Sequence, residues 1–340
     1  MELERYEQFG DAIRRRRREL GLSQNALADR IGTSRQNLAE IEAGRRMPQL
    51  TLASQLAHAL GWTLDDLDRQ LDRVDARMRW LRRAVPPDAT PVVWSRMAGH
   101  LLLAEAGQLA PQFAVDAVWD AGRGTLVEVP GSADPLKTLF VAGCDPFLEW
   151  LWQRTPHPEM HLYIFSMGSE AAIAALSRSE VQVAGTHLYD EASGRYNDLI
   201  AHLPFETQRW PYLYWETGVM GALEKPDGWV LRERGSEARA LFERSQRQTP
   251  LEQPITVELD SHWAIARYIS IHPNLAGVGL GAVAGALGLP FKQWAHEPYE
   301  WVTRAEWMGD PRLKAFESWL KSAPVTRALA SLPRLHPWSS

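Results

Sequence analysis

The chain has 340 residues with a net charge of −5 at pH 7, and this length allows a second domain with a sizeable core beside a small first one. Its single cysteine, Cys144, excludes an intrachain disulfide and a cysteine-based zinc cluster. The polar N-terminus and the lack of an apolar stretch of about 20 residues predict a cytoplasmic protein with neither a secretion signal nor a membrane span.

Residues 23–48 have the pattern of two short helices joined by a tight turn. Ser23 can cap the first helix, and Gly32 can end it because glycine reaches positive φ without steric cost. Thr33 or Ser34 can cap the second helix, and a further helix from about residue 50 to 60 would close the core. The second helix carries four polar side chains of the types that read base edges in the major groove: Arg35, Gln36, Asn37 and Glu40.

This segment resembles the lambda-repressor or XRE type of helix-turn-helix regulator over roughly residues 8–70. The resemblance is carried by Ser23, Gln24, Leu27, Ala28, Gly32, Glu42, Gly44 and Pro48. It implies that residues 1–70 form an all-α DNA-binding domain in which some polar side chains contact phosphates and others face bases. The candidate DNA contacts are Gln24, Ser34, Arg35, Gln36, Asn37, Glu40 and Arg45.

The distribution of charge favours double-stranded DNA as a partner of this end of the chain. Residues 1–85 hold 16 arginines and 13 acidic residues, a net charge of +3, whereas the remaining 255 residues hold 21 basic and 29 acidic residues, a net charge of −8. Positive charge is therefore concentrated where the sequence predicts DNA binding.

Residues 71–88 are predicted to form a linker helix that stops at the two prolines 86 and 87. Apolar side chains recur every three or four residues here, the period of a helix with an apolar seam: Leu64, Leu67, Leu71, Val74, Met78, Leu81 and Val85. Two interpretations stay open. The seam can join a homodimer, which would place two recognition helices about 34 Å apart on a palindromic operator. Alternatively, its residues pack on the neighbouring domains.

The pattern then changes from helices to strands. Residues 89–135 carry apolar runs separated by glycine-rich turns, which predicts a strand-rich connector. Further along, strands alternate with helices, which predicts a mostly parallel sheet with sites at the C-terminal ends of its strands. Asp145 is expected to cap a helix that begins at Pro146, and a turn at Gly168 and Ser169 is expected to precede the next helix.

A second resemblance covers roughly residues 136–335. It is carried by GCDP at 143–146, GTHLYDEASGRYN at 185–197, RERGSEAR at 232–239 and the glycine-rich stretch at 277–291. These segments resemble the periplasmic-binding-protein-like domain of molybdate-type bacterial regulators. The resemblance implies two α/β lobes that are joined by crossover strands and close on a small ligand. It also implies molybdate, tungstate or a related anionic metabolite as the effector.

The side chains in these segments suit an anion. Backbone N–H groups at helix N-termini, adjoining hydroxyl groups and arginine side chains all stabilise a desolvated negative charge. No cofactor and no metal site is expected. The candidate ligand contacts are Asp145, Ser169, His187, Arg234, Ser236 and Arg239.

Two other kinds of function are alternatives to a ligand-sensing regulator. The sequence has no P-loop, no G-x-S-x-G and no H-E-x-x-H motif, so an enzyme is not predicted. Residues 231–239 depart from the Asn-Arg-x-x-Gly-Ser-Gly-Thr-Arg motif common in the molybdate-type family. This departure leaves open a regulator with a degenerate pocket, whose C-terminal domain serves dimerisation or protein interaction.

Overall fold

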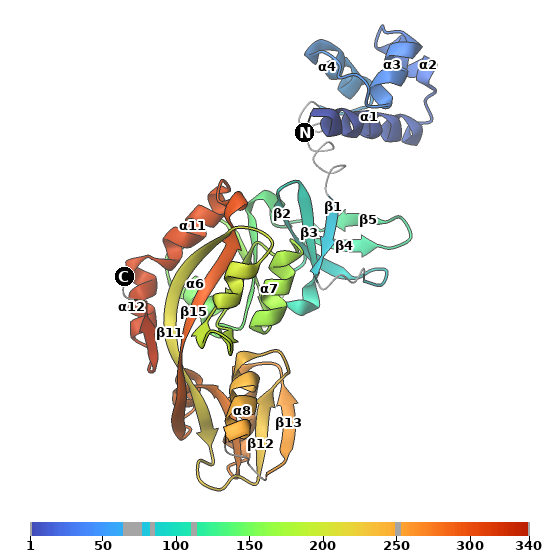
Figure 1. Cartoon of the computed structure of the whole chain (residues 1–340). Coiled ribbons are helices and arrows are strands. Elements are labelled where there is room, and N and C mark those ends of the chain that lie inside the picture. The colour runs from blue at the N-terminus through green and yellow to red at the C-terminus, as the bar shows by residue number, and fades with distance from the viewer. Residues whose placement is uncertain (1, 64–76, 82–85, 110–113, 249–252, 339–340) are drawn as a thin grey trace. The chain divides into compact units, whose positions relative to one another are not determined.

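The computed structural model describes residues 2–63, 77–81, 86–109, 114–248 and 253–338 (Figure 1). The chain divides into two compact units, Met1–Met78 and Arg79–Ser340. Every helix among the described residues is too short or too polar to cross a membrane.

The described residues of the N-terminal unit form a bundle of four helices. They are α1 (Glu2–Glu19), α2 (Gln24–Arg30), α3 (Arg35–Glu42) and α4 (Leu50–Ala59). The Ser23 hydroxyl accepts a hydrogen bond from the Ala26 N–H at 3.1 Å, and the Ser34 hydroxyl accepts one from the Asn37 N–H at 3.1 Å. Gly32 has a φ of +65° in the turn between α2 and α3. The predicted caps, turn and helices of this segment are confirmed.

A buried ion pair ties α1 to the end of α3. The Arg17 guanidinium donates to both carboxylate oxygens of Glu42, at 2.6 and 2.9 Å, and to the Leu22 carbonyl at 2.8 Å. Arg17 is 8% exposed and Glu42 is 3% exposed. The pair lies beside an apolar core made of Phe9, Ile13, Leu27, Ala28, Ile31, Leu38, Ile41, Leu56, Ala57 and Leu60.

The C-terminal unit opens with a five-stranded sheet of order β1-β3-β2-β4-β5. Its strands are β1 (Arg77–Trp80), β2 (Pro91–Met97), β3 (His100–Glu105), β4 (Ala117–Asp120) and β5 (Thr125–Glu128). The β2–β3 and β4–β5 neighbours pair antiparallel, as the predicted strand-rich segment requires. Val93 and Leu102 of this sheet belong to the same apolar core as Leu139 and Phe140 of the following strand.

The predicted linker helix is wrong at residues 77–80, which form β1 at the edge of this sheet. Trp80 is buried there and packs edge-on against Trp119 of β4, with ring centroids 5.2 Å apart. This tertiary contact outweighs the helical spacing of the apolar residues. Leu81 of the predicted seam is 2% exposed and packs in the apolar core of the C-terminal unit, as the second interpretation expected for this residue. The rest of the predicted seam, at residues 64–74 and 85, lies outside the described residues.

The larger sheet has nine strands and carries two lobes. Its order is β13-β12-β14-β11-β15-β8-β6-β7, and β16 pairs with β11 beside this path. The strands are β6 (Thr138–Gly143), β7 (His161–Ser166), β8 (Val183–Thr186), β11 (Thr207–Gly221), β12 (Gly228–Arg232), β13 (Ile255–Leu259), β14 (Leu275–Leu280), β15 (Phe291–Arg304) and β16 (Leu335–Pro337). A hairpin of β9 (Tyr189–Asp190) and β10 (Arg195–Tyr196) follows β8.

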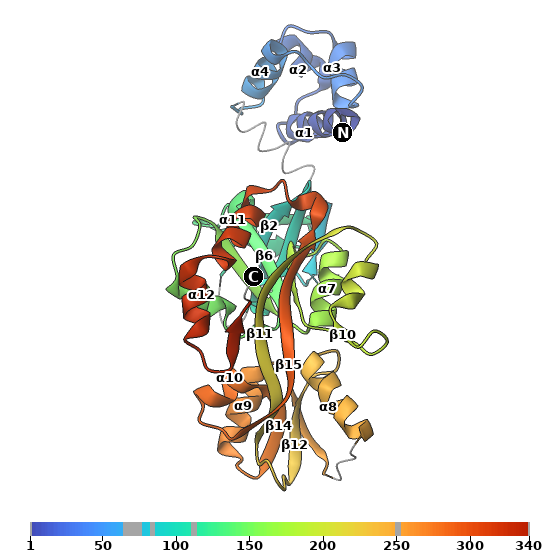
Figure 2. The same ribbon diagram turned by 60° about the vertical axis from the view of Figure 1, so that its left-hand side comes forward.

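Each lobe has a parallel core, and two long antiparallel strands connect the lobes. In the first lobe β6 pairs parallel with β7 and β8, and in the second lobe β12 pairs parallel with β13 and β14. Strands β11 and β15 pair along their whole length, from Thr207 opposite Arg304 to Met220 opposite Phe291, and run through both lobes (Figure 2). The predicted two-lobe α/β fold with crossover strands is confirmed.

Helices cover both lobes of this sheet (Figures 1 and 2). They are α6 (Leu148–Arg154), α7 (Ser169–Ser177), α8 (Glu237–Gln248), α9 (His262–Ile271), α10 (Gly281–Ala286), α11 (Pro311–Leu320) and α12 (Ala323–Ala330). Helices α6 and α7 follow strands β6 and β7 of the first lobe, whereas α8, α9 and α10 follow strands of the second lobe. The loops that connect strands to helices therefore place residues of both lobes near the crossover strands.

Candidate functional site

The N-terminal unit presents polar side chains from α3 and from the loop that follows it. Arg35, Gln36 and Arg45 are exposed. Glu40 is half-buried and forms an ion pair with Arg45 at 3.5 Å. The Asn37 amide donates to the Thr33 hydroxyl at 2.8 Å, which holds the Asn37 side chain against the turn. Ser34 uses its hydroxyl as the helix cap, so among these candidates Arg35 and Gln36 are the exposed side chains that neither a cap nor an ion pair with a described residue holds in place.

A basic groove of 680 Å³ lies beside this face. It is lined by Arg14, Arg17, Arg18, Ser23, Gln24, Asn25, Arg35 and Glu42. The Gln24 amide donates to Glu42 at 2.9 Å, so the same carboxylate that holds Arg17 also fixes Gln24 at the groove. Of the predicted DNA contacts, the groove brings together Gln24 and Arg35, and the other five residues do not line it. Its arginines give the groove a positive field that suits a phosphate chain.

A second pocket, of 200 Å³, lies in the C-terminal unit at the start of α8. It is lined by Glu170, Leu188, Arg234, Gly235, Ser236, Glu237, Arg239, Ala240 and Glu243. Three of the six predicted ligand contacts, Arg234, Ser236 and Arg239, therefore share one pocket. Arg234 is exposed, whereas the buried Arg239 guanidinium donates to Glu243 at 2.7 Å and to Glu258 at 2.6 Å.

The predicted helix cap at Asp145 is wrong. Helix α6 begins at Leu148 with Phe147 as its N-cap, because the Asp145 carboxylate accepts the Phe147 N–H at 2.9 Å within a preceding turn. Burial raises the pKa of Asp145 to about 7, although the hydrogen bond from the Phe147 N–H acts in the opposite direction. Asp145 is absent from the lining of the 200 Å³ pocket.

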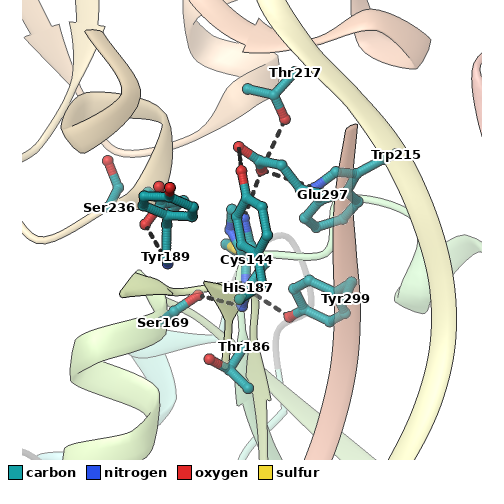
Figure 3. Close-up of polar contacts among 12 residues, drawn as sticks. Cys144, Ser169, Thr186, His187, Tyr189, Trp215, Thr217, Ser236, Glu297 and Tyr299 are labelled. Atoms are coloured by element: carbon teal, nitrogen blue, oxygen red, sulfur yellow. Dashed lines mark hydrogen bonds and ion pairs between the residues drawn. The ribbon is translucent and has the colours of Figure 1, made fainter. Parts of the chain in front are cut away.

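The two remaining candidates, Ser169 and His187, are buried and in contact with each other. The Ser169 hydroxyl accepts the His187 N–H at 3.3 Å, at the points where α7 begins and β8 ends. The His187 ring contacts polar groups through both nitrogens: Nε2 lies 3.2 Å from the Cys144 sulfur, and Nδ1 lies 2.8 Å from the Glu297 carboxylate (Figure 3). His187 is thus held inside the protein rather than projecting into the pocket.

Glu297 on β15 anchors this buried cluster. Besides His187, its carboxylate accepts from the Thr217 hydroxyl at 2.9 Å and the Trp215 indole at 3.2 Å (Figure 3). It also accepts from the Tyr196 hydroxyl at 3.4 Å. Burial lowers the pKa of His187, but the facing Cys144 sulfur and the Glu297 carboxylate raise it, and the net result is a pKa of about 10. The His187 ring therefore lies between a sulfur and a carboxylate, one at each of its two nitrogens.

Sequence reasoning did not find this cluster. Cys144 is the single cysteine of the chain, and Glu297 lies 110 residues from His187 within the HEPYEWV segment at 296–302. No local signal sets Glu297 apart, because the same strand also carries Lys292, Gln293, His296 and Glu300. Among the described residues, no group of three or more histidine, cysteine, aspartate or glutamate side chains is placed to hold a metal ion.

Two family descriptions match the two units. A helix-turn-helix family matches residues 13–67, and the PBP superfamily domain matches residues 153–321. The chain is 51% identical over 49 residues to an uncharacterized HTH-type transcriptional regulator of Methanothermobacter thermautotrophicus (strain Delta H), a match covering 14% of this chain and 71% of that protein. The chain belongs to the helix-turn-helix transcriptional regulators. It combines an XRE-type DNA-binding domain with a PBP-like domain, and this family is one of regulators, not of enzymes.

Solved structures resemble the C-terminal unit at low sequence identity. A putative phosphate ABC transporter substrate-binding protein with bound phosphate, from Clostridium perfringens, is 12% identical with a TM-score of 0.47, covering 59% of this chain and 100% of that one. The CcmR regulatory domain of Synechocystis PCC6803 in complex with 2-PG is 14% identical with a TM-score of 0.41, covering 55% of this chain and 98% of that one.

Proposed function

We propose that this regulator acts in the cytoplasm as a homodimer that binds a palindromic operator and responds to a small anionic metabolite. The observation that carries the DNA-binding part is the exposed Arg35 and Gln36 pair on a capped helix beside a groove rich in arginine. Arginine pairs with guanine and glutamine with adenine in the major groove. The seven candidate DNA contacts are proposed as a whole. Gln24 and Asn37 would contact phosphates and Arg45 the DNA backbone, whereas Arg35, Gln36 and Glu40 would face bases.

The test begins with an operator selected from random duplexes by the wild-type protein. Replacing Arg35 or Gln36 by alanine should cost about 1–3 kcal/mol each in discrimination between the operator and a scrambled duplex at fixed salt. The matched control is Arg267→Ala, which removes one exposed positive charge from the C-terminal unit. Unchanged operator preference in both α3 variants would reject α3 as the reading helix.

The effector is assigned to the 200 Å³ pocket at the start of α8. Among the described residues, the structure shows no hydrogen bond or ion pair for the Arg234 side chain, so its guanidinium can bind an anionic group in the pocket. The Ser236 hydroxyl donates to the Glu233 carbonyl at 2.9 Å and lies at the same wall. Glu170 and Glu237 also line the pocket, which favours a metabolite with a localised anionic group over a bare divalent oxyanion.

Thermal unfolding in the presence of molybdate, tungstate, phosphate and small carboxylates tests this assignment. A ligand at 100 times its Kd should add about 2.7 kcal/mol to the free energy of unfolding. Arg234→Ala should remove the stabilisation, whereas Arg327→Ala, an exposed arginine outside the pocket, should keep it. A stabilisation that survives Arg234→Ala would place the effector elsewhere.

Direct contacts between the two lobes favour a second candidate function. Glu237 of α8 accepts the Tyr189 N–H at 3.1 Å, and the Trp263 indole of α9 donates to the Pro146 carbonyl at 3.4 Å. Lobes held together by their own side chains need no ligand to close. In this case the C-terminal unit would serve dimerisation or protein interaction, and light scattering of the unit with no added compound would show a dimer while no compound shifts its unfolding.

A further inference from the structure

Three side chains from three different elements meet inside the C-terminal unit. Cys144 follows β6, His187 follows β8 and Glu297 lies on β15. Their exposed fractions are 6%, 1% and 0%. The sulfur lies 3.2 Å from Nε2 of His187, and Nδ1 of the same ring lies 2.8 Å from Glu297 (Figure 3). This order of thiol, imidazole and carboxylate is that of an activated nucleophile.

The imidazole is held in this position from several sides. Its backbone N–H is bonded to Ser169, and its ring packs edge-on against Trp215 and tilted against Tyr299, with centroid distances of 5.0 and 5.6 Å. Glu297 cannot turn away, because it also accepts from Thr217, Trp215 and Tyr196. A cysteine that merely fills space requires no oriented base, and this cysteine has one.

Hydrogen bonding favours the charged form of the cluster. A carboxylate that accepts several hydrogen bonds is stabilised as the anion. The anion in turn stabilises a proton on both nitrogens of His187, so that Nε2 becomes a donor and the sulfur becomes its acceptor. The other titratable groups that interact electrostatically with members of this cluster are Tyr196, Tyr299, Glu237 and His262, and Asp145 interacts in turn with Tyr299.

We propose that Cys144 is a thiolate paired with the His187 imidazolium, and that it reacts with hydrogen peroxide. The size of the reagent follows from enclosure, because a cysteine residue that is only 6% exposed admits a molecule about as large as water more readily than a bulky electrophile. This reactive site is separate from the 200 Å³ pocket, whose lining includes none of the three residues.

The reaction of the Cys144 thiolate with hydrogen peroxide needs no other reagent. The thiolate attacks one peroxide oxygen, an S–O bond forms, and the O–O bond breaks. The sulfur loses two electrons and becomes a sulfenic acid, while the second oxygen leaves as hydroxide. Hydroxide takes the proton from the His187 imidazolium and departs as water. His187 thus acts first as the counter-ion of the thiolate and then as the acid for the leaving group.

The first experiment measures the ultraviolet absorbance of the thiolate in the full chain as a function of pH, with Cys144→Ser subtracted. Because the chain has one cysteine, the difference belongs to Cys144 alone. At pH 7 a thiol with the ordinary pKa of about 8.5 is only about 3% ionised, so a paired thiolate gives a roughly 30-fold larger signal. A difference that rises only above about pH 8 would overturn the proposal.

The second experiment tests the roles of the partners. Glu297→Gln keeps the size of the side chain but removes its charge, and should shift the thiolate titration toward the ordinary thiol range. Mass spectrometry after peroxide and a sulfenic-acid trap should show an adduct on Cys144 in the wild-type chain and a smaller yield in Glu297→Gln. Should Glu297→Gln fail to fold, the wild-type titration alone decides. A thiolate present at neutral pH that forms no trapped adduct would retain the ion pair but reject peroxide as its reagent.

Discussion

Replacing Arg17 by methionine should destabilise the N-terminal unit far more than the loss of an ordinary surface charge. The change removes three hydrogen bonds, two to Glu42 and one to the Leu22 carbonyl, while methionine keeps most of the apolar stem. Glu42, which is 3% exposed in the native fold, would then keep only the Gln24 amide as a hydrogen-bond partner among the described residues. Breaking a buried ion pair by removing one member costs about 3–5 kcal/mol.

That cost is a large part of the stability of so small a unit. A unit spanning Met1–Met78 is expected to have roughly 4–12 kcal/mol of unfolding free energy at typical values per residue. Hydrogen exchange with mass spectrometry, read on peptides from α1 to α4, reports this unit separately from the other. The slowest amides should lose protection by roughly two to three and a half orders of magnitude in Arg17→Met.

Two further variants make the reasoning refutable. Glu19→Gln removes the 51%-exposed partner of an α1 surface pair and should cost less than about 1 kcal/mol. Arg17→Met combined with Glu42→Leu removes both buried charges and should recover most of the lost stability. The reasoning fails if Arg17→Met costs no more than Glu19→Gln, or if the double variant is as unstable as the single one.

Two other predictions concern the C-terminal unit. Because burial raises the pKa of Asp145 from 3.8 to about 7, its native carboxyl holds a proton more tightly than the unfolded chain does, so stability should fall as pH rises from about 4 to 7. Urea unfolding of Asp145→Asn should lack this component, which is on the order of 4 kcal/mol, and equal pH slopes in both proteins would contradict the assignment. Gly185→Ala would place a Cβ 1.9 Å from a tyrosine hydroxyl and 2.6 Å from its ring, and should cost at least about 1–3 kcal/mol in thermal unfolding. The control Gly107→Ala meets nothing within 4 Å, and equal melting temperatures for the two variants would refute the packing argument.

The helix-turn-helix was predictable from the sequence because its signals are local. A capping serine lies at most three residues from the N–H it accepts, and Gly32 needs positive φ whatever the rest of the fold does. The same local logic failed at Asp145, where the carboxylate bonded to a turn two residues ahead and the helix began later. The prediction of a linker helix failed at residues 77–80 for a similar reason, because Trp80 packs against Trp119 on another strand, a contact that no local pattern shows.

The candidate sites of the C-terminal unit could be predicted only in part. Arg234, Ser236 and Arg239 share a pocket because they lie on one short stretch at the start of α8. The Cys144, His187 and Glu297 cluster requires the pairing of β8 with both β6 and β15, which brings together residues 43 and 110 positions apart. No local pattern encodes such a pairing. The sequence therefore predicts His187 as a ligand contact and gives no sign of its contacts with Cys144 and Glu297.

Both units position their polar groups with a buried glutamate from a distant element. Glu42 holds Arg17 and Gln24 at the groove beside α3, and Glu297 holds His187 against Cys144. A buried carboxylate is costly unless each oxygen is bonded, so its partners have little freedom to move. Replacement of either glutamate by leucine should destabilise its unit, and the two variants should differ in whether a second substitution restores the lost stability. Among the described residues, Arg17 is the one charged partner of Glu42, so Arg17→Met can compensate for Glu42→Leu. Glu297 orients groups from several elements, and no single second substitution can satisfy all of those groups.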